Sequence, residues 1–439
     1  MLTIIRVDFK NPDDPDDTSF EPHPTDYPVV YLEYPNNDAQ ESFVLLAPKD
    51  KDHYNPIMCL ESTLHTIIAH YLTPAQAALF GTLPDKDVTD DDEDDADDIP
   101  ERSKSVSPYP VSEAPSPPSS EVSPHVDYLR LLQRAIKKRD GPMFMKVMSA
   151  INALLSLLKY PPLPLDPFDA PAANHLGVTV RGWQRIPTNV VHRIADETYQ
   201  RAVGPHIDVL KRYEAFSSEV YGELMPTFVS DVIRATGLHG GSLFLDMGSG
   251  VGNVVMQASL ETGCRSYGIE IMPGPAQIAR SQLEQFKTRC RMWGVRMGEV
   301  ELEEGDMLKS AKVDELVKSA DVVLVNNKVF LEPLNEALRQ KFLDLKEGAI
   351  VVSLKCLMGS GRSAARERSA SPALKERNLD DISEIFTVTA RPYYPGSVSW
   401  GGAGGEYFLQ RMNREDYARR KMLFESSRAG SGRVTRSRR

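Results

Sequence analysis

The sequence predicts an α/β protein built on a doubly wound, mostly parallel sheet with a closing hairpin. From about residue 186, helical stretches alternate with short apolar segments at 243–247, 266–269, 299–302, 321–325 and 349–353. Repeated strand–helix–strand units of this kind are typical of a parallel sheet covered by helices on both faces. Two further strand candidates, 385–389 and 407–410, follow at the end of this region and would close a seven-stranded sheet.

The chain ahead of the sheet divides into three parts by composition. Residues 1–80 are expected to form a small α+β unit, with strands at 29–32 and 43–46 and a helix over 57–71. Residues 81–126 combine eleven acids within 85–101 with a Ser/Pro tract, a composition that predicts a disordered linker. Residues 127–240 are expected to be mainly helical, with the Pro-rich segment 161–171 breaking one helix.

Charge and cysteine usage restrict the setting of the protein. The sheet is expected to occupy 241–412 and to be followed by a basic tail, 413–439, while the Arg-rich segment 359–377 suggests a loop. Four widely spaced cysteines, without a C-x-x-C pair, predict neither a disulfide framework nor a metal centre. The first ten residues lack a signal-like apolar run, and no membrane span is expected.

A glycine-rich turn after the first strand of the sheet is the main local motif. The strand 243–247 runs into Gly248-Ser249-Gly250-Val251-Gly252-Asn253, and a helix is expected over 254–262. Glycines let the backbone turn tightly and approach a ligand, and the helix N-terminus offers free N–H groups. Since a glycine loop alone is a weak signal, a strand–helix turn without a ligand is the alternative.

Acidic residues at three successive strand ends strengthen the ligand interpretation. Asp246 precedes the glycine turn, Glu270 ends the second strand, and Asp306 follows the third. An acid at the second position can bind both ribose hydroxyls of a nucleoside. Asp246 suits a cationic methionine group better than a diphosphate, so S-adenosylmethionine is favoured over a nicotinamide dinucleotide.

Three longer motifs carry a resemblance to a known family. They are residues 213–226 (YEAFSSEVYGELMP), 325–327 (VNN) and 396–400 (GSVSW). Together with the glycine loop, they resemble the disruptor-of-telomeric-silencing family, the histone lysine methyltransferases without a SET domain, in its fungal form. The resemblance covers about residues 186–410. It implies a class I S-adenosylmethionine-dependent methyltransferase with a Rossmann-like seven-stranded sheet, preceded by a helical N-terminal extension.

The resemblance also implies roles for particular residues. Its expected methyl-donor contacts are Tyr221, Gly222, Glu223 and Leu224 in a covering loop, Asp246, Gly248, Ser249, Gly250, Gly252 and Asn253 at the methionine part, Glu270 at the ribose, and Asp306 with Met307 at the adenine. Its expected catalytic residues are Asn326 beside the methyl group and Phe330, Trp400 and Tyr407 along a narrow lysine channel. Core packing of Phe330 and Trp400, and a simple turn at Asn326, are the alternatives. Lys328 departs from the family pattern, which has an uncharged residue there.

The expected reaction is methyl transfer to the lysine at position seventy-nine of histone H3 on nucleosomes. The family further implies a nuclear protein with roles in telomeric silencing and the DNA damage checkpoint. DNA phosphates and the acidic histone surface are the expected docking partners, for which Lys137-Lys138-Arg139, the 362–377 loop and the basic tail are candidates. We expect a monomer without a metal. A methyltransferase for RNA or another protein, and a non-catalytic chromatin-binding homologue, are the alternatives.

Overall fold

The predicted α/β class is confirmed by a seven-stranded mixed sheet with the order β10-β11-β9-β8-β5-β6-β7. The computed structural model describes residues 5–6, 9–21, 27–48, 54–83, 126–166, 168–170, 173–210, 222–358 and 382–431. The strands are β5 (Leu243–Met247), β6 (Arg265–Glu270), β7 (Val300–Glu304), β8 (Val322–Val325), β9 (Ile350–Ser353), β10 (Phe386–Tyr393) and β11 (Gly405–Met412). The first five run parallel, and β11 pairs antiparallel with both β9 and β10.

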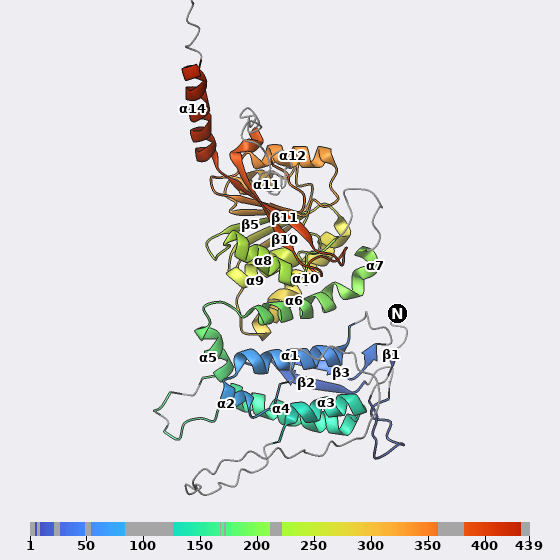
Figure 1. Cartoon of the computed structure of the whole chain (residues 1–439). Helices are drawn as coiled ribbons and strands as arrows, with labels where there is room; N and C mark the ends of the chain where they lie inside the picture. Colours follow the sequence, from blue (N-terminus) through green and yellow to red (C-terminus); the bar gives the residue numbers. More distant parts are fainter. Residues whose placement is uncertain are drawn as a thin grey trace, which may run out of the picture.

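Helices cover both faces of this sheet (Figure 1). The helices are α8 (Pro226–Thr236), α9 (Asn253–Thr262), α10 (Pro273–Met292), α11 (Ala311–Val317) and α12 (Glu332–Phe342). Apolar residues of α11 and α12 pack with Leu245 and Val323 on one face, whereas α8 and α9 pack with Phe244 and Leu324 on the other. Every residue of β5, β8 and β9 is buried, which explains why these strands have nearly continuous apolar sequences.

The N-terminal unit lies below the sheet domain in Figure 1 and consists of helices and two small two-stranded antiparallel sheets. Its elements are β1 (Ile5–Arg6) with β4 (Ala47–Pro48), β2 (Val29–Glu33) with β3 (Gln40–Val44), α1 (Pro56–Tyr71), α2 (Pro74–Ala77), α3 (Tyr128–Lys138), α4 (Gly141–Lys159) and α5 (His175–Gly182). The strand expected at 43–46 ends at Val44 and begins earlier, at Gln40. The pairing with β2 sets both ends, since Gln40 lies opposite Glu33 and Val44 lies opposite Val29.

The N-terminal unit and the sheet domain share one apolar core. Helix α6 (Thr188–Ala202) lies between them and is followed by the short turns η1 (Gly204–His206) and α7 (Ile207–Leu210). Trp293 at the end of α10 is fully buried and contacts Tyr34 edge to face and Tyr71 at a tilt. The buried residues of this shared core range in the sequence from Phe9 to Val295. Burial of an indole stabilises this contact by about 2–3 kcal/mol.

A buried ionic cluster lies in the same interface. Glu197 of α6 is fully buried and accepts hydrogen bonds from Trp293 Nε1 at 3.0 Å and Tyr34 Oη at 3.2 Å. Arg289 of α10 donates to both carboxylate oxygens of Glu41, at 2.5 and 2.6 Å. Because buried charges are tolerated only when paired, this cluster fixes α10 against the N-terminal unit.

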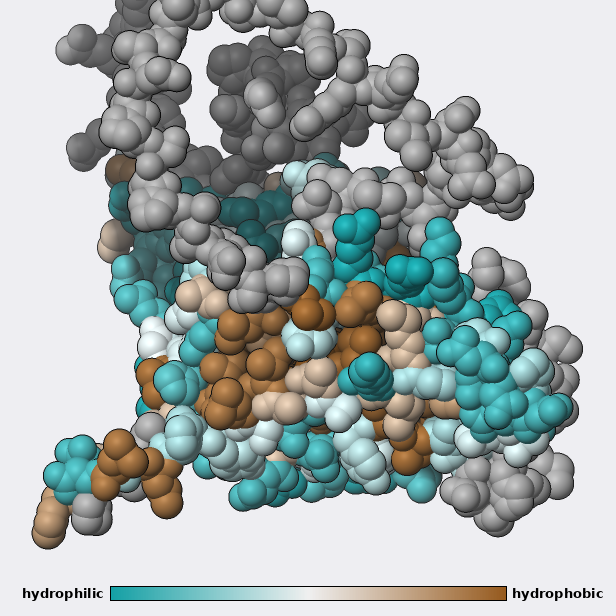
Figure 2. All heavy atoms as spheres, turned by 90° about the horizontal axis from the view of Figure 1, so that it is seen from below, coloured by the Kyte–Doolittle hydropathy of each residue, from teal (hydrophilic) through white to brown (hydrophobic). Residues whose placement is uncertain are grey.

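Helix α14 (Arg414–Ser431) occupies part of the expected basic tail, and α4 is the helix expected ahead of the Pro-rich segment. Helix α14 projects from the top of the molecule in Figure 1. Helix α4 is long and apolar enough to cross a membrane by length and composition alone. Core helices of globular proteins meet the same criterion. Figure 2 shows apolar side chains gathered on the underside of the N-terminal unit, where α4 lies with Met145 and Leu157 exposed. Residues 84–125 of the expected acidic linker, and the 362–377 loop, lie outside the described residues.

Candidate functional site

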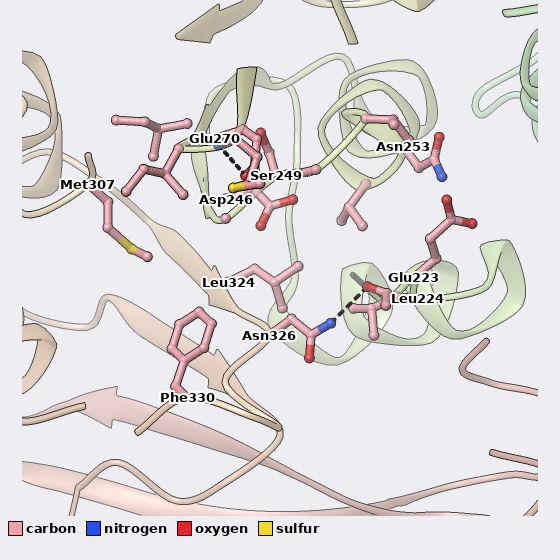
Figure 3. Close-up of a pocket in the computed structure, with 18 of the residues that line it drawn as sticks. Glu223, Leu224, Asp246, Ser249, Asn253, Glu270, Met307, Leu324, Asn326 and Phe330 are labelled. Carbon is pink, nitrogen blue, oxygen red and sulfur yellow. Dashed lines mark hydrogen bonds between the residues drawn. The ribbon is translucent and has the colours of Figure 1, made fainter. Parts of the chain in front are cut away.

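A pocket opens at the carboxyl ends of the central parallel strands. Strand β5 lies between β6 and β8, where the strand order reverses and where open α/β sheets bind ligands. The pocket is lined by Gly222, Glu223, Leu224, Asp246, Gly248, Ser249, Gly250, Val251, Asn253, Val254, Ile269, Glu270, Ile271, Met272, Gly305, Asp306, Met307, Leu324, Asn326, Phe330 and Leu334. Figure 3 shows Met307 and Phe330 toward one end and Glu223 and Asn253 toward the other.

The glycine turn forms one wall of this pocket. Gly248 and Gly250 have φ angles of +96° and +54°, a left-handed region that side chains disfavour. The N–H groups of Gly248 and Ser249 donate to the carbonyl of Ile269 at 3.0 and 2.9 Å, which bends the chain across β6. Gly252 does not line the pocket, and a Cβ there would lie 2.9 Å from Met256 Cε. Its role is therefore to let the chain enter α9.

The carboxylate of Glu270 holds the turn from the opposite side. It accepts hydrogen bonds from Gly250 N at 2.8 Å and from Met272 N at 2.9 Å (Figure 3). Each carboxylate oxygen keeps further acceptor capacity for a ligand hydroxyl. Glu270 therefore both shapes the glycine turn and presents negative charge to the pocket.

Asp306 occupies the corresponding position after β7. Its carboxylate accepts from Leu308 N at 2.9 Å and forms an ion pair with Lys309 at 3.0 Å. The backbone hydrogen bond from Leu308, followed by the Lys309 interaction, lowers the pKa of Asp306 below its ordinary value. This side chain is therefore ionised at neutral pH and can accept from an amino group.

Asp246 has the opposite electrostatic character. It is almost fully buried at the end of β5 but still lines the pocket. Burial, followed by repulsion from the charge of Glu270, raises the pKa of Asp246 to about 8. A carboxyl group held in this state favours a cationic ligand, which would supply the missing positive charge.

The covering segment 222–224 is held by a distant part of the chain. Glu223 N donates to Ser399 Oγ at 2.9 Å, Ser399 N donates to Glu223 O at 3.0 Å, and Leu224 bridges to Val398. Tyr199 Oη also donates to Glu223 Oε1 at 3.0 Å. The GELMP and GSVSW motifs, about 175 residues apart, thus form one structure.

Asn326 connects the covering segment to the end of β8. Its Nδ2 donates to the carbonyl of Gly222 at 3.1 Å (Figure 3). Its Oδ1 is buried and has no hydrogen-bond partner. A buried amide oxygen without a donor costs about 1–3 kcal/mol, so a ligand donor here would be favoured. Asn327 is fully buried and accepts from Leu354 N and Lys355 N at 3.0 and 2.8 Å, which fixes this turn.

Some expected site residues lie away from the pocket. Tyr407 is buried in the core on the α8 face, with its ring 5.1 Å from that of Phe228, and does not line the pocket. Trp400 is 38% exposed and its ring lies against Gly222, where a Cβ would come within 2.5 Å of Trp400 Cε3. Tyr221 lies outside the described residues. Lys328 is exposed and does not line the pocket.

Several pocket residues were missed by the sequence reasoning. Ile271, Met272, Leu324 and Leu334 line the pocket with apolar surface. No motif marks Leu324 or Leu334, which resemble ordinary core residues in the sequence. Met272 follows Glu270 by two residues, and its backbone N–H donates to that carboxylate. This closeness in the sequence could have identified Met272 as a pocket residue. Among the described residues, no group of three His, Cys, Asp or Glu side chains is placed to hold a metal ion.

The strand order, the closing antiparallel strand and the pocket at the carboxyl ends define a class I S-adenosylmethionine-dependent methyltransferase fold. The family model for histone methylation protein DOT1 matches residues 199–412. Relatives named "Histone-lysine N-methyltransferase, H3 lysine-79 specific" occur in Mycosarcoma maydis and Emericella nidulans, each 32% identical and matched over 89% and 90% of this chain. The chain belongs to the DOT1 family.

The relatives that this chain matches are longer than the chain. The chain spans 60% and 66% of the length of those two relatives. A third relative, from Gibberella zeae, is 44% identical over 51% of this chain and 43% of its own length. An O-methyltransferase from Bacillus cereus in complex with SAH is 15% identical, with a TM-score of 0.31 over 50% of this chain and 90% of its own.

Proposed function

We propose that this chain transfers a methyl group from S-adenosylmethionine to the lysine at position seventy-nine of histone H3 on nucleosomes. The activity for which its DOT1-family relatives are named supports this substrate. The observation that carries the proposal is the pocket itself. A glycine turn, a strand-end acid with a raised pKa, and a buried unpaired acceptor on Asn326 meet in one place.

The residues present fit the proposed methyl donor. Asp246 and the glycine turn would hold its cationic methionine part, Glu270 its ribose hydroxyls, and Asp306 with Met307 its adenine. Each assignment pairs a charge or hydrogen-bonding group with its chemical complement. When bound, the donor supplies an electrophilic methyl group on a sulfonium centre.

The chain's own residues must deliver a neutral amine to that methyl group. Deprotonating a lysine with an ordinary pKa of about 10.4 at pH 7 costs about 5 kcal/mol. Leu224, Leu324 and Phe330 give part of the wall an apolar character, which disfavours the charged amine and lowers this cost. Asn326 Oδ1 can accept an amine N–H and orient the nitrogen lone pair. We therefore assign catalysis to desolvation and positioning.

Trp400 and Tyr407 keep only indirect roles in this proposal. Trp400 packs on Gly222 and would hold the covering segment in place. Tyr407 packs behind the pocket with Phe228 and would support that wall. A direct contact of either ring with the substrate lysine stays a prediction of the family resemblance.

We further propose that the protein is nuclear and binds nucleosomes through basic surfaces. Lys137 and Lys138 are exposed on α3, and Lys421 is exposed on α14. These helices lie at opposite ends of the molecule (Figure 1). Arg419 and Arg420 already pair with Asp416, so they contribute less free charge than the sequence suggests. Contacts of cations with DNA phosphates would make the affinity fall as salt concentration rises.

Methyl transfer to recombinant nucleosomes tests the proposed function. Labelled methyl from S-adenosylmethionine should enter histone H3 on nucleosomes, at the lysine at position seventy-nine, and not free H3. Gly250→Arg serves as the inactive control, since a long side chain at a φ of +54° would fill the pocket wall. Labelling of RNA or another histone, or cofactor binding without any transfer, would contradict the proposal.

A further inference from the structure

The segment between α4 and α5 exposes apolar side chains that no core needs. Leu163, Leu165 and Phe168 are 80%, 104% and 95% exposed, the highest values among the large apolar residues that the structure describes. The segment extends away from the body in Figure 1 and Figure 2. Its sequence over 161–168 is PPLPLDPF. When exposed apolar side chains gather on one part of the surface, they can mark a site of interaction with another protein.

Both ends of this segment are fixed to one turn of the N-terminal unit. At its start, Tyr160 Oη accepts a hydrogen bond from Asp38 N at 2.7 Å. At its end, Asn174 Nδ2 donates to Pro35 O at 2.9 Å and to Asn37 Oδ1 at 2.7 Å. Because the two ends meet on the 35–38 turn, the described residues 161–166 are presented on a fixed base.

The proline spacing determines the backbone shape of this peptide. Pro161, Pro162 and Pro164 fix φ near −65°, and residues ahead of a proline are restricted to extended geometry. The described residues 161–164 belong to no helix or strand. This proline spacing favours a left-handed polyproline II conformation, which loses little entropy on binding. Leu163 then lies between two prolines and adds apolar contact.

We propose that residues 161–166 are a docking peptide for a proline-binding domain of the WW class, whose groove is lined by aromatic side chains. Such domains recognise preformed polyproline II segments. Charge separates this partner from an SH3 domain, which pairs a cation beside the prolines with its own acids. The neighbouring cation here, Lys159, is buried and pairs with Glu33 at 2.6 Å, and the segment continues into Asp166 and Asp169.

The chain contains a matched control for this peptide. Pro12 and Pro15 have the same spacing as Pro161 and Pro164 and are exposed, but two aspartates separate them. A partner that reads prolines with an intervening leucine should ignore this second site. The comparison therefore separates recognition of the 161–166 peptide from a general affinity for exposed prolines.

Titration of the full chain with two isolated probe domains tests the proposal. The probes are a WW domain selective for Pro-Pro-Leu-Pro peptides and an SH3 domain. The wild-type chain should bind the WW domain, and the Pro161→Ala/Pro164→Ala and Leu163→Ala variants should each lose affinity about tenfold or more. The Pro12→Ala/Pro15→Ala variant should bind like the wild type.

Thermal unfolding of each variant separates binding from folding. Leu163 is 80% exposed, so Leu163→Ala should leave the melting temperature unchanged. Equal WW binding by the wild-type chain and both peptide variants would overturn the proposal. So would absence of WW binding by the folded wild-type chain, or preferential binding of the SH3 domain.

Discussion

The raised pKa of Asp246 makes a quantitative prediction about methyl-donor binding. Burial and the neighbouring Glu270 charge raise the pKa of this carboxyl to about 8. About one tenth of the Asp246 carboxyl groups are then ionised at pH 7, and about one hundredth at pH 6. A cationic donor binds the ionised form, so its affinity should rise about tenfold from pH 6 to 7 and about fivefold from pH 7 to 8.

Calorimetric titration with S-adenosylmethionine measures this effect directly. At pH 7, binding should release about nine tenths of a proton, seen as a heat that depends on the ionisation enthalpy of the buffer. Asp246→Asn should bind weakly and without this pH dependence. Asp306→Asn is the matched control, because Asp306 has a lowered pKa and stays ionised over the same range. A wild-type affinity that is flat from pH 6 to 8 would refute the electrostatic reasoning.

The same pKa has a consequence for stability. The folded-state pKa of Asp246 lies above its ordinary value of 3.8, so the unfolded chain ionises first as pH rises. The ligand-free protein should therefore lose stability between about pH 4 and pH 8. Asp246→Asn removes this loss and should raise the melting temperature more at pH 8 than at pH 4. An equal effect at both pH values would contradict the assigned direction.

Three further predictions concern single side chains. Glu270→Ala should weaken methyl-donor binding by about tenfold to a hundredfold, because two backbone N–H groups lose a charged acceptor, and calorimetry with unchanged affinity would remove this role. Asn326→Ala should lower turnover on nucleosomes about tenfold or more, while donor affinity stays within about twofold in the same titration. Glu197→Ala should lower the free energy of unfolding by about 3–5 kcal/mol in urea, since Arg289 and Trp293 lose a buried partner. The exposed pair of Glu336 with Arg339 provides the control, and Glu336→Ala should cost less than about 1 kcal/mol.

Local sequence alone determined the sheet and the chemistry at its strand ends. The predicted strand ranges overlap all seven strands of the sheet. The prediction is sharpest at β5, which matches its predicted range because buried parallel strands require continuous apolar residues. The glycine turn and the acids Asp246, Glu270 and Asp306 were identifiable because parallel strands bring their carboxyl ends to one edge. These features depend on residues close together in the chain.

Only the tertiary structure decided which distant residues meet. Pairing of Glu223 with Ser399, and burial of Trp293 against Tyr34, join segments about 175 and 260 residues apart, which no periodicity encodes. Tyr407 illustrates the limit, since an aromatic residue in a terminal strand can face a channel or the core, and here it packs on Phe228. The pKa of Asp246 likewise depends on burial by several elements at once. The sequence therefore determined which chemical groups the protein carries, and packing determined where they face and how strongly they are charged.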